Sequence, residues 1–398
     1  MATPSRRSIL GGTAAGAVGG LLGAATRAEP AAATGTRATR TRWVTSWATA
    51  QTAPTPTDPD ALNGFTNTTI HHTLHLTAGT TTGTARAAIG SADGAKVRLR
   101  FAHPFGVLPV VLGPVSVASS QSGGERRVLF GGEPQVVIAA GATVVSDPVS
   151  IAVPDGGDLA VNMHLPGPTG PLSFHRNVHA TGHVGDRPTN SVFLLTGVDV
   201  PANGRVSLAV LGDSITEGVG TPDNANLRWP DQYAARFRRR PAISNLGISG
   251  NRVLLDDARF GPSGQSRFDR DVLALPNIRT LVIFLGINDI QQPPSQTDPQ
   301  QILHGYEQLV RRAHDHDLEV IGATIGPFKG WSRYTATLDQ VRNEVNAVLR
   351  RGQLFDRLLD VDAALRDPAD PAQLRPAFNS GDGLHPNPTG AQAIAAIL

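Results

Sequence analysis

The sequence predicts two folded regions in succession, an all-β sandwich over residues 43–200 and an α/β domain over residues 205–398. Up to about residue 200, apolar residues alternate with polar ones or form short runs, which is the pattern of strands. Residues 201–204, Pro-Ala-Asn-Gly, interrupt this pattern. Beyond them, apolar runs alternate with segments of helical periodicity, as expected of a parallel sheet that helices cover on both faces.

The strands of the first region are short and closely spaced. Alternation is clearest over residues 96–101 and 158–165, where every second side chain is a large apolar one. Because many short strands with no long helical pattern between them are typical of antiparallel sandwiches, we predict a jelly-roll-like arrangement. Further apolar runs cover residues 110–112, 128–130, 136–138, 149–153 and 192–195.

The second region alternates strands with helices. In the segment 302–313 the apolar side chains fall on one helical face. Strands that alternate with helices form parallel sheets, in which active residues collect at the carboxyl ends of the strands. The predicted strands cover residues 206–211, 280–285, 318–325 and 354–361, and the predicted helices cover residues 229–240, 302–313 and 338–349.

Composition excludes several classes of protein. A chain of 398 residues exceeds the size of a single core, and 40% apolar residues suffice for two cores. The net charge of +2 is too small to predict a nucleic-acid partner. The absence of cysteine excludes disulfides, thiolate nucleophiles and cysteine-ligated metals, and we predict that catalysis requires no metal or organic cofactor.

Three histidines recur every four residues and would form a metal-binding face on a helix. They are His175, His179 and His183. Glycine and proline residues surround them, however, and these residues disfavour a helix. We therefore assign the three histidines to strands or loops and predict no metal site.

The N-terminus predicts export. Residues 1–28 place Arg6-Arg7 before an apolar, Gly/Ala-rich stretch, in the manner of a twin-arginine signal peptide. A membrane anchor is the alternative, but the stretch is too short and too rich in glycine to span a bilayer stably. We expect a secreted, extracellular protein without stable membrane insertion after signal removal, in which residues 29–42 form a flexible linker.

Four polar segments follow predicted strands or precede the last helix, at residues 211–218, 245–251, 285–289 and 382–386. A serine hydroxyl becomes a nucleophile only when a base removes its proton. The first segment contains Ser214, and the last contains His385 as the natural base. Asp382, three residues earlier, can hold the imidazole through its other nitrogen.

The two middle segments offer donors for a tetrahedral oxyanion. The backbone N–H groups of Ser214 and Gly250 and the side-chain amide of Asn288 could supply three of them. Glycine lets the backbone approach a substrate closely. Each segment alone is also compatible with an ordinary turn or a helix cap. Their joint occurrence in this order favours a catalytic site.

These residues resemble the four sequence blocks of the SGNH hydrolases, also called GDSL lipases and esterases, over residues 205–398. The resemblance implies a flavodoxin-like three-layer α/β/α domain, with Ser214 as nucleophile and with Asp382 and His385 completing a triad. It also places Gly250 and Asn288 in the oxyanion hole, with Gly247 as the alternative glycine in the second block. The preceding β region further resembles that of secreted actinobacterial GDSL proteins. Position 216 is Thr, which disfavours the Gly-x-Ser-x-Gly elbow of α/β-hydrolases.

The predicted function is that of a secreted serine esterase acting through an acyl-enzyme on Ser214, with short acyl groups and a small-molecule or carbohydrate alcohol. The alternatives are a lipase or phospholipase, an acyltransferase with the same triad, and a non-catalytic glycan-binding protein. Trp229 and Trp331 are candidate substrate-binding residues, and core packing is the alternative role for each. Nothing in the sequence indicates an oligomeric state.

Overall fold

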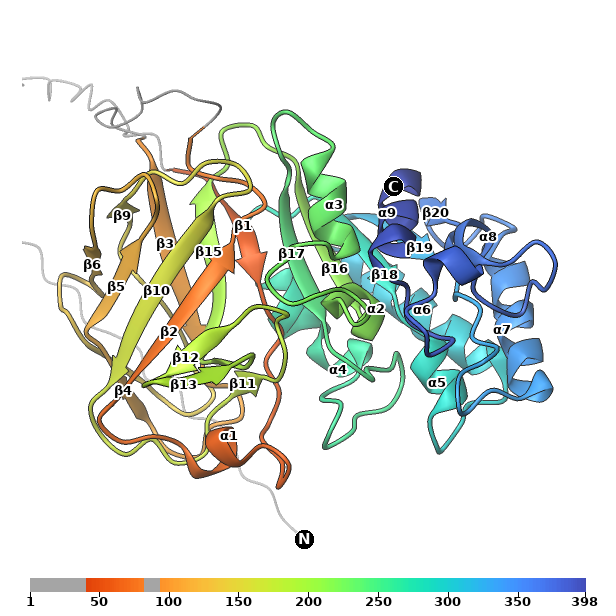
Figure 1. Cartoon of the computed structure of the whole chain (residues 1–398), viewed down its shortest axis with the longest axis horizontal. Helices are drawn as coiled ribbons and strands as arrows, with labels where there is room; N and C mark the ends of the chain where they lie inside the picture. Colours follow the sequence, from red (N-terminus) through yellow and green to blue (C-terminus); the bar gives the residue numbers. More distant parts are fainter. Residues whose placement is uncertain (1–40, 82–93) are drawn as a thin grey trace, which may run out of the picture. The chain divides into compact units, whose positions relative to one another are not determined.

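Antiparallel strands make up the first part of the structure, and strands alternating with helices make up the second (Figure 1). The computed structural model describes residues 41–81 and 94–398. The predicted signal peptide and nearly all of the predicted linker lie outside these residues. No helix within the described ranges has the length and apolar character needed to cross a bilayer.

Two main sheets and two short strand pairs form the antiparallel part, together with helix α1 (Pro59–Asn63). In β10 the residues alternate between buried and partly exposed, as the sequence pattern predicts. Both sheets contribute their buried side chains to one core, which contains Leu99 of β3 and Val161 of β10. One sheet runs β1 (Trp43–Ala48), β15 (Leu195–Pro201), β3 (Lys96–Ala102), β8 (Thr143–Val145), with β9 (Val149–Ser150) on β3; the other runs β13 (Arg187–Thr189), β12 (Gly182–Val184), β2 (Thr68–His75), β10 (Asp158–Leu165), β5 (Val115–Ala118), β6 (Arg126–Val128); the short pairs are β11 (Phe174–His175) with β14 (Val192–Phe193) and β4 (Val110–Leu112) with β7 (Val136–Ile138).

A five-stranded parallel sheet with helices on both faces forms the second part. Successive residues of β16 enter different cores, because side chains alternate across a strand. Leu211 packs on the side of α6 and α7, and Val210 packs on the side of α3 and α9. The strands are β17 (Ala242–Gly247), β16 (Ser207–Gly212), β18 (Thr280–Phe284), β19 (Glu319–Ala323) and β20 (Arg357–Leu359), in this order; the helices are α2 (Ser214–Glu217), α3 (Trp229–Ala235), α4 (Gly264–Phe268), η2 (Asp269–Leu273), α5 (Ile287–Gln291), α6 (Pro299–His314), α7 (Ala336–Leu349), α8 (Val361–Leu365), η3 (Pro376–Phe378) and α9 (Pro388–Ile397).

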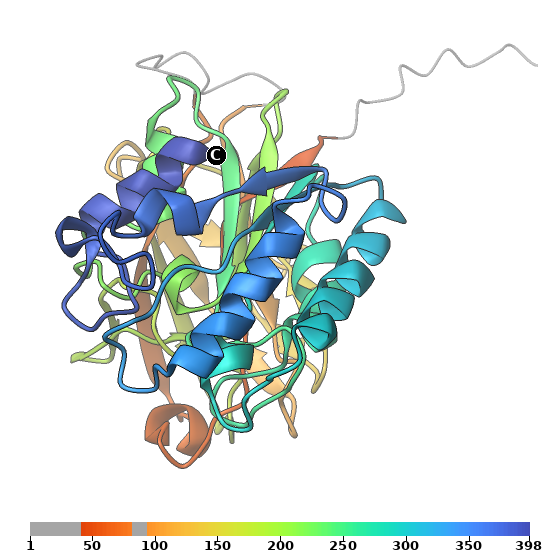
Figure 2. The same cartoon turned by 90° about the vertical axis from the view of Figure 1, so that its right-hand side faces the viewer.

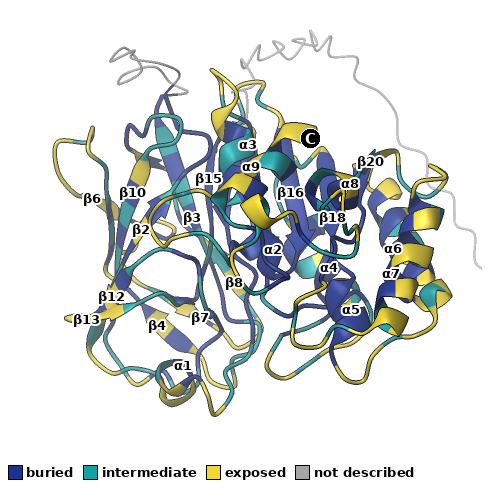
Figure 3. Ribbon diagram, turned by 45° about the vertical axis from the view of Figure 1, so that its right-hand side comes forward, coloured by how far each residue is buried: buried dark blue, intermediate teal, exposed yellow. Residues whose placement is uncertain are grey.

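The covering helices are amphipathic. Helices α6 and α7 lie side by side (Figure 2), with buried residues toward the sheet and exposed residues on the outside (Figure 3). Together with the antiparallel part, these layers confirm the predicted fold class, an α/β domain with a parallel sheet preceded by a β region.

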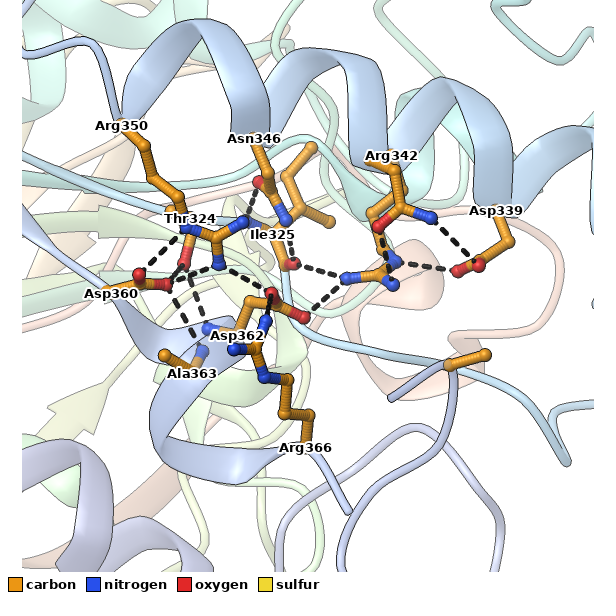
Figure 4. Close-up of polar contacts among 12 residues, drawn as sticks. Thr324, Ile325, Asp339, Arg342, Asn346, Arg350, Asp360, Asp362, Ala363 and Arg366 are labelled. Carbon is orange, nitrogen blue, oxygen red and sulfur yellow. Dashed lines mark hydrogen bonds and ion pairs between the residues drawn. The ribbon is translucent and has the colours of Figure 1, made fainter. Parts of the chain in front are cut away.

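A buried network of ion pairs and hydrogen bonds links α7 to α8 and to Ile325, just after the end of β19 (Figure 4). The Arg342 guanidinium donates to Asp339 at 2.7 Å and to Asp362 at 2.5 Å. The side chain of Asn346 accepts the backbone N–H of Ile325 and donates to its carbonyl oxygen, both at 2.8 Å. Because buried charges need partners, this network fixes the chain just after β19.

The antiparallel part packs directly on the parallel sheet. Ala48 and Ala50 belong to the core of the α/β part, and β1 contacts β17. The backbone N–H of Ile243 donates to the Thr77 hydroxyl at 2.9 Å. Residues 201–204 thus mark the change from one sequence pattern to the other. In the folded chain, the core of the antiparallel part lies directly against the core of the α/β part.

Candidate active site

Ser214 lies at the carboxyl end of β16, where the strand turns into α2. Asp213 is the N-cap of this helix, and its side chain accepts the backbone N–H of Ile215 at 3.0 Å. Ser214 is therefore the first helical residue, and the helix does not use its backbone N–H. The strand end and the cap together present the hydroxyl and a backbone donor at the edge of the sheet.

His385 and Asp382 come from the loop before α9. One oxygen of the Asp382 carboxylate accepts the backbone N–H groups of Leu384 and His385, at 2.8 and 2.9 Å. The other oxygen lies 2.6 Å from Nδ1 of His385. Nε2 of His385 lies 2.8 Å from Oγ of Ser214. With the Nδ1 proton directed at the carboxylate, Nε2 is free to accept the serine proton.

The Asp382 carboxylate stays ionised in this arrangement. Burial alone would raise its pKa, but the hydrogen bonds from the side chain and backbone of His385 and from the backbone of Leu384 outweigh that effect, so its pKa lies well below the ordinary value. An ionised partner stabilises the imidazolium that forms when His385 takes up a proton.

Gly250 follows β17, in a backbone conformation that favours glycine. Its φ is +78°, and a Cβ atom added to it would lie 2.2 Å from Cδ1 of Phe260. A Cβ on Gly247 would instead meet the backbone nitrogen of Glu217 at 2.3 Å. Gly247 is therefore needed for close packing under α2, and Gly250 remains the predicted glycine of the oxyanion hole.

Asn288 is the second residue of α5, directly after β18, and it is buried. Its Oδ1 accepts hydrogen bonds from Nε2 of Gln291 at 2.7 Å and of Gln292 at 2.9 Å. Its Nδ2 lies 3.1 Å from the carbonyl oxygen of Asn251 and 3.4 Å from Asp213. The amide is thus oriented with its N–H groups toward the nucleophile loop.

Gln291 and Gln292 did not emerge from the sequence as site residues. Gln292 also donates to the carbonyl oxygen of Gly250 at 3.2 Å, so it ties the two candidate oxyanion residues together. The signal that could have identified Gln291 is its position three residues after Asn288 on a helix, where side chains meet. Gln292 follows directly, as the C-cap of that helix.

Two buried carboxyl groups lie near the serine. Burial is the main cause that raises the pKa of Asp213 to about 7 and that of Asp289 to about 6. The Asp289 carboxyl group accepts the backbone N–H groups of Val253 and Leu254, at 2.8 and 3.0 Å. It therefore holds the chain that follows Gly250.

The two candidate substrate-binding tryptophans differ in their placement. Trp331 is half-buried, its ring meets that of His385 edge to face at 5.7 Å between centroids, and its Nε1 donates to Gln291 at 3.1 Å. Trp229 is only 1% exposed, packs in the core beside α3 and donates from Nε1 to the Thr216 hydroxyl. The structure corrects the pocket-wall role for Trp229, because a side chain enclosed in this way has no surface for a substrate.

The three regularly spaced histidines have separate partners. Nε2 of His175 lies 3.2 Å from Glu217, and Nδ1 of His179 lies 3.2 Å from Asp223. His183 lies on β12 beside His71. Within residues 41–81 and 94–398, no group of three or more His, Asp or Glu side chains is arranged to hold a metal ion.

Glu217, at the end of α2, is a second buried group that sequence reasoning missed. Burial would raise its pKa, but the hydrogen bond and charge of His175 and the hydrogen bond of Ser249 lower it below the ordinary value. His175 belongs to the antiparallel part, on β11. The antiparallel part therefore contacts the helix that carries the nucleophile.

Residues 210–393 match the model of the GDSL-like Lipase/Acylhydrolase family. No curated protein matches the chain.

Three solved structures are among those to which part of this chain is similar. A GDSL-like lipase from Bacteroides thetaiotaomicron has 19% identity and a TM-score of 0.37, with 48% of this chain and 84% of that chain covered. The aryl esterase of M. smegmatis has 16% identity and a TM-score of 0.40, with 48% and 94% covered. A carbohydrate acetylesterase from Sinorhizobium meliloti has 17% identity and a TM-score of 0.38, with 48% and 95% covered.

Proposed function

We infer that this chain, whose residues 210–393 match the model of the GDSL-like lipase/acylhydrolase family, is a secreted serine esterase that hydrolyses esters of short acyl groups through an acyl-enzyme on Ser214. The observation that carries the mechanism is the continuous contact from the Ser214 hydroxyl through both nitrogens of His385 to Asp382, with distances of 2.8 and 2.6 Å.

The reaction begins when Oγ of Ser214 attacks the ester carbonyl and its proton passes to Nε2 of His385. The carbonyl oxygen becomes an oxyanion, which the backbone N–H groups of Ser214 and Gly250 and Nδ2 of Asn288 stabilise. His385 then protonates the leaving alcohol, and the acyl-enzyme forms. Water attacks the acyl group by the same route, the proton returns to Ser214, and the carboxylic acid leaves.

Trp331 supports the assignment of short acyl groups. The indole stands against the imidazole, and its N–H is already bonded to Gln291, so the side chain occupies the space beside the catalytic base. Its flat apolar ring also suits the packing of a sugar ring, and we propose a carbohydrate as the alcohol.

A series of nitrophenyl esters of rising chain length, run beside acetylated xylo-oligosaccharides, tests this proposal. We expect turnover to be highest with acetyl and butyryl esters, and we expect Ser214→Ala to lower kcat by about 10⁴-fold or more while the fold is kept. The matched control is Ser295→Ala, an exposed serine, which should retain full activity. Retained turnover in Ser214→Ala would overturn the mechanism, and highest turnover with long acyl chains would overturn the acyl preference.

Export follows from a separate feature, Arg6-Arg7 before the apolar stretch of residues 1–28. We expect the protein isolated from culture medium to begin near Glu29, as N-terminal sequencing would show. Replacing both arginines by lysine should retain the protein inside the cell. Export that persists in this double variant would contradict the twin-arginine route.

A further inference from the structure

A cavity of about 660 Å³ opens on the outer face of the six-stranded antiparallel sheet. Strands β2, β10, β5 and β6, which lie side by side in Figure 1, form its floor. The buried face of the same sheet packs on the core, so the cavity lies on the opposite side. Its volume falls within the range of ligand sites in proteins, which is roughly 300–1,000 Å³.

Polar side chains form a straight row across this face. The register pairs His183 with His71, His71 with Asn162, Asn162 with Ser116, and Ser116 with Arg127. Residues paired in this way share one face of a sheet. The row crosses five strands, β12, β2, β10, β5 and β6, and at about 4.8 Å per strand it extends for about 19 Å.

Some of these polar groups are oriented by one another, and one is free for a ligand. Nδ1 of His71 lies 2.5 Å from Oδ1 of Asn162, and Nδ2 of Asn162 donates to Glu125 at 2.7 Å. Arg127 lines the cavity, and its guanidinium has no hydrogen bond or ion pair with any residue in the described ranges. Asn162 is thus preorganised, while Arg127 retains all of its donors.

We propose that this polar row, from His183 to Arg127, binds an oligosaccharide chain laid across the strands. The amide of Asn162 and the guanidinium of Arg127 in this row, with the Glu125 carboxylate beside it, offer donors and acceptors for neighbouring hydroxyl groups. Pro114 and Pro134 in the wall of the cavity offer apolar surface to the carbon face of a sugar ring.

Other polymers fit this row less well. A nucleic acid requires several cations for its phosphates, whereas the row has one arginine with the Glu125 carboxylate beside it. An added peptide strand would pair along the free edge of β6, whereas the row crosses β2, β10 and β5, which are paired on both sides.

Co-sedimentation with insoluble arabinoxylan, cellulose and chitin tests the proposal. The protein is the full chain carrying Ser214→Ala, so that hydrolysis cannot alter the ligand and the result does not depend on the proposed esterase activity. We expect retention on at least one of these polysaccharides. Asn162→Ala and Arg127→Ala should each weaken that binding about tenfold or more, because each removes hydrogen bonds to the ligand.

The matched control is Arg126→Ala, which removes the preceding arginine of β6, a residue that does not line the cavity. Its binding should equal that of the parent protein. Thermal unfolding of all variants verifies that the sheet is intact. The proposal is overturned if none of the three polysaccharides is bound, or if neither Asn162→Ala nor Arg127→Ala weakens binding.

Discussion

Asp213 shows how a single buried group links the site to stability. This residue is 1% exposed and lies directly before the nucleophile. Burial, with smaller contributions from the charges of Asp289 and Glu217, raises its pKa to about 7, against 3.8 for an exposed aspartate. Between these two values the folded protein holds a proton that the unfolded chain has released, so the free energy of unfolding falls as the pH rises.

We predict that Asp213→Asn removes this loss of stability. An amide can still accept the N–H of Ile215, but it does not titrate. Relative to the variant, the wild-type protein should lose about 4 kcal/mol of unfolding free energy between pH 4 and pH 8. Urea unfolding of both proteins across this range measures the difference. Parallel pH profiles would contradict the assignment of a raised pKa to Asp213.

At the residue scale, the sequence predicts those catalytic residues that belong to a short, recognisable motif. The contact between Ser214 and His385 could be anticipated, because the four polar segments occur together in an order that favours a catalytic site. The burial of Trp229 could not, since a tryptophan at the start of a helix fits a pocket wall and a core equally well. Glu217 was missed because its partner, His175, lies in the other sequence region and only tertiary packing brings the two together.

At the scale of elements, α5 orients the side-chain amide of Asn288, which is a predicted donor of the oxyanion hole. Asn288 lies in its first turn, and Gln291 and Gln292 follow at its end, where both donate to Oδ1 of Asn288. Arg252 in turn donates to the side-chain oxygen of Gln292 at 3.2 Å. Each group in this chain limits the rotation of the next, so the amide is oriented before a substrate arrives.

We predict that Gln292→Ala lowers kcat about tenfold and leaves KM nearly unchanged, because an amide that is less well oriented stabilises the transition state less and the bound ester about equally. Steady-state kinetics on a nitrophenyl acetate substrate separates the two constants. Gln300→Ala, an exposed glutamine on α6, is the control and should match the wild type. A higher KM with an unchanged kcat would assign Gln292 to substrate binding instead.

The sequence pattern predicts the existence of elements better than their bounds. Strand β17 is not among the strands predicted above, and it extends from Ala242 to Gly247 through the polar Asn245. That residue is tolerated because its side chain donates to the carbonyl oxygen of Thr216 at 2.7 Å, a contact that no periodicity reports. The predicted helix over residues 229–240 ends at Ala235, and exposed residues follow it. The strand order is likewise absent from the pattern.

At the scale of the whole molecule, the antiparallel part and the α/β part each contribute residues to the other part's core. Ala48 and Ala50 extend the core of the α/β part, and Ala242 of the parallel sheet extends the core of the antiparallel part. The amide of Asn277 donates to the carbonyl oxygen of Trp43 at 2.8 Å. Unfolding either part would expose apolar surface and unpaired polar groups on the other.

We therefore predict that residues 41–398 unfold in a single cooperative transition. Differential scanning calorimetry should give one peak, with equal calorimetric and van't Hoff enthalpies. Two separate peaks, or an enthalpy ratio near two, would show that the antiparallel and parallel parts unfold independently.

The central claim is that His385 activates the hydroxyl of Ser214. Reaction with a fluorophosphonate, followed by peptide mapping by mass spectrometry, tests it most directly, because this reagent modifies a serine only when a neighbouring base has made it nucleophilic. We predict one adduct, on Ser214, that forms at least a hundred times more slowly in His385→Ala and is absent in Ser214→Ala. An adduct on another residue, or unchanged labelling of Ser214 in His385→Ala, would contradict the mechanism.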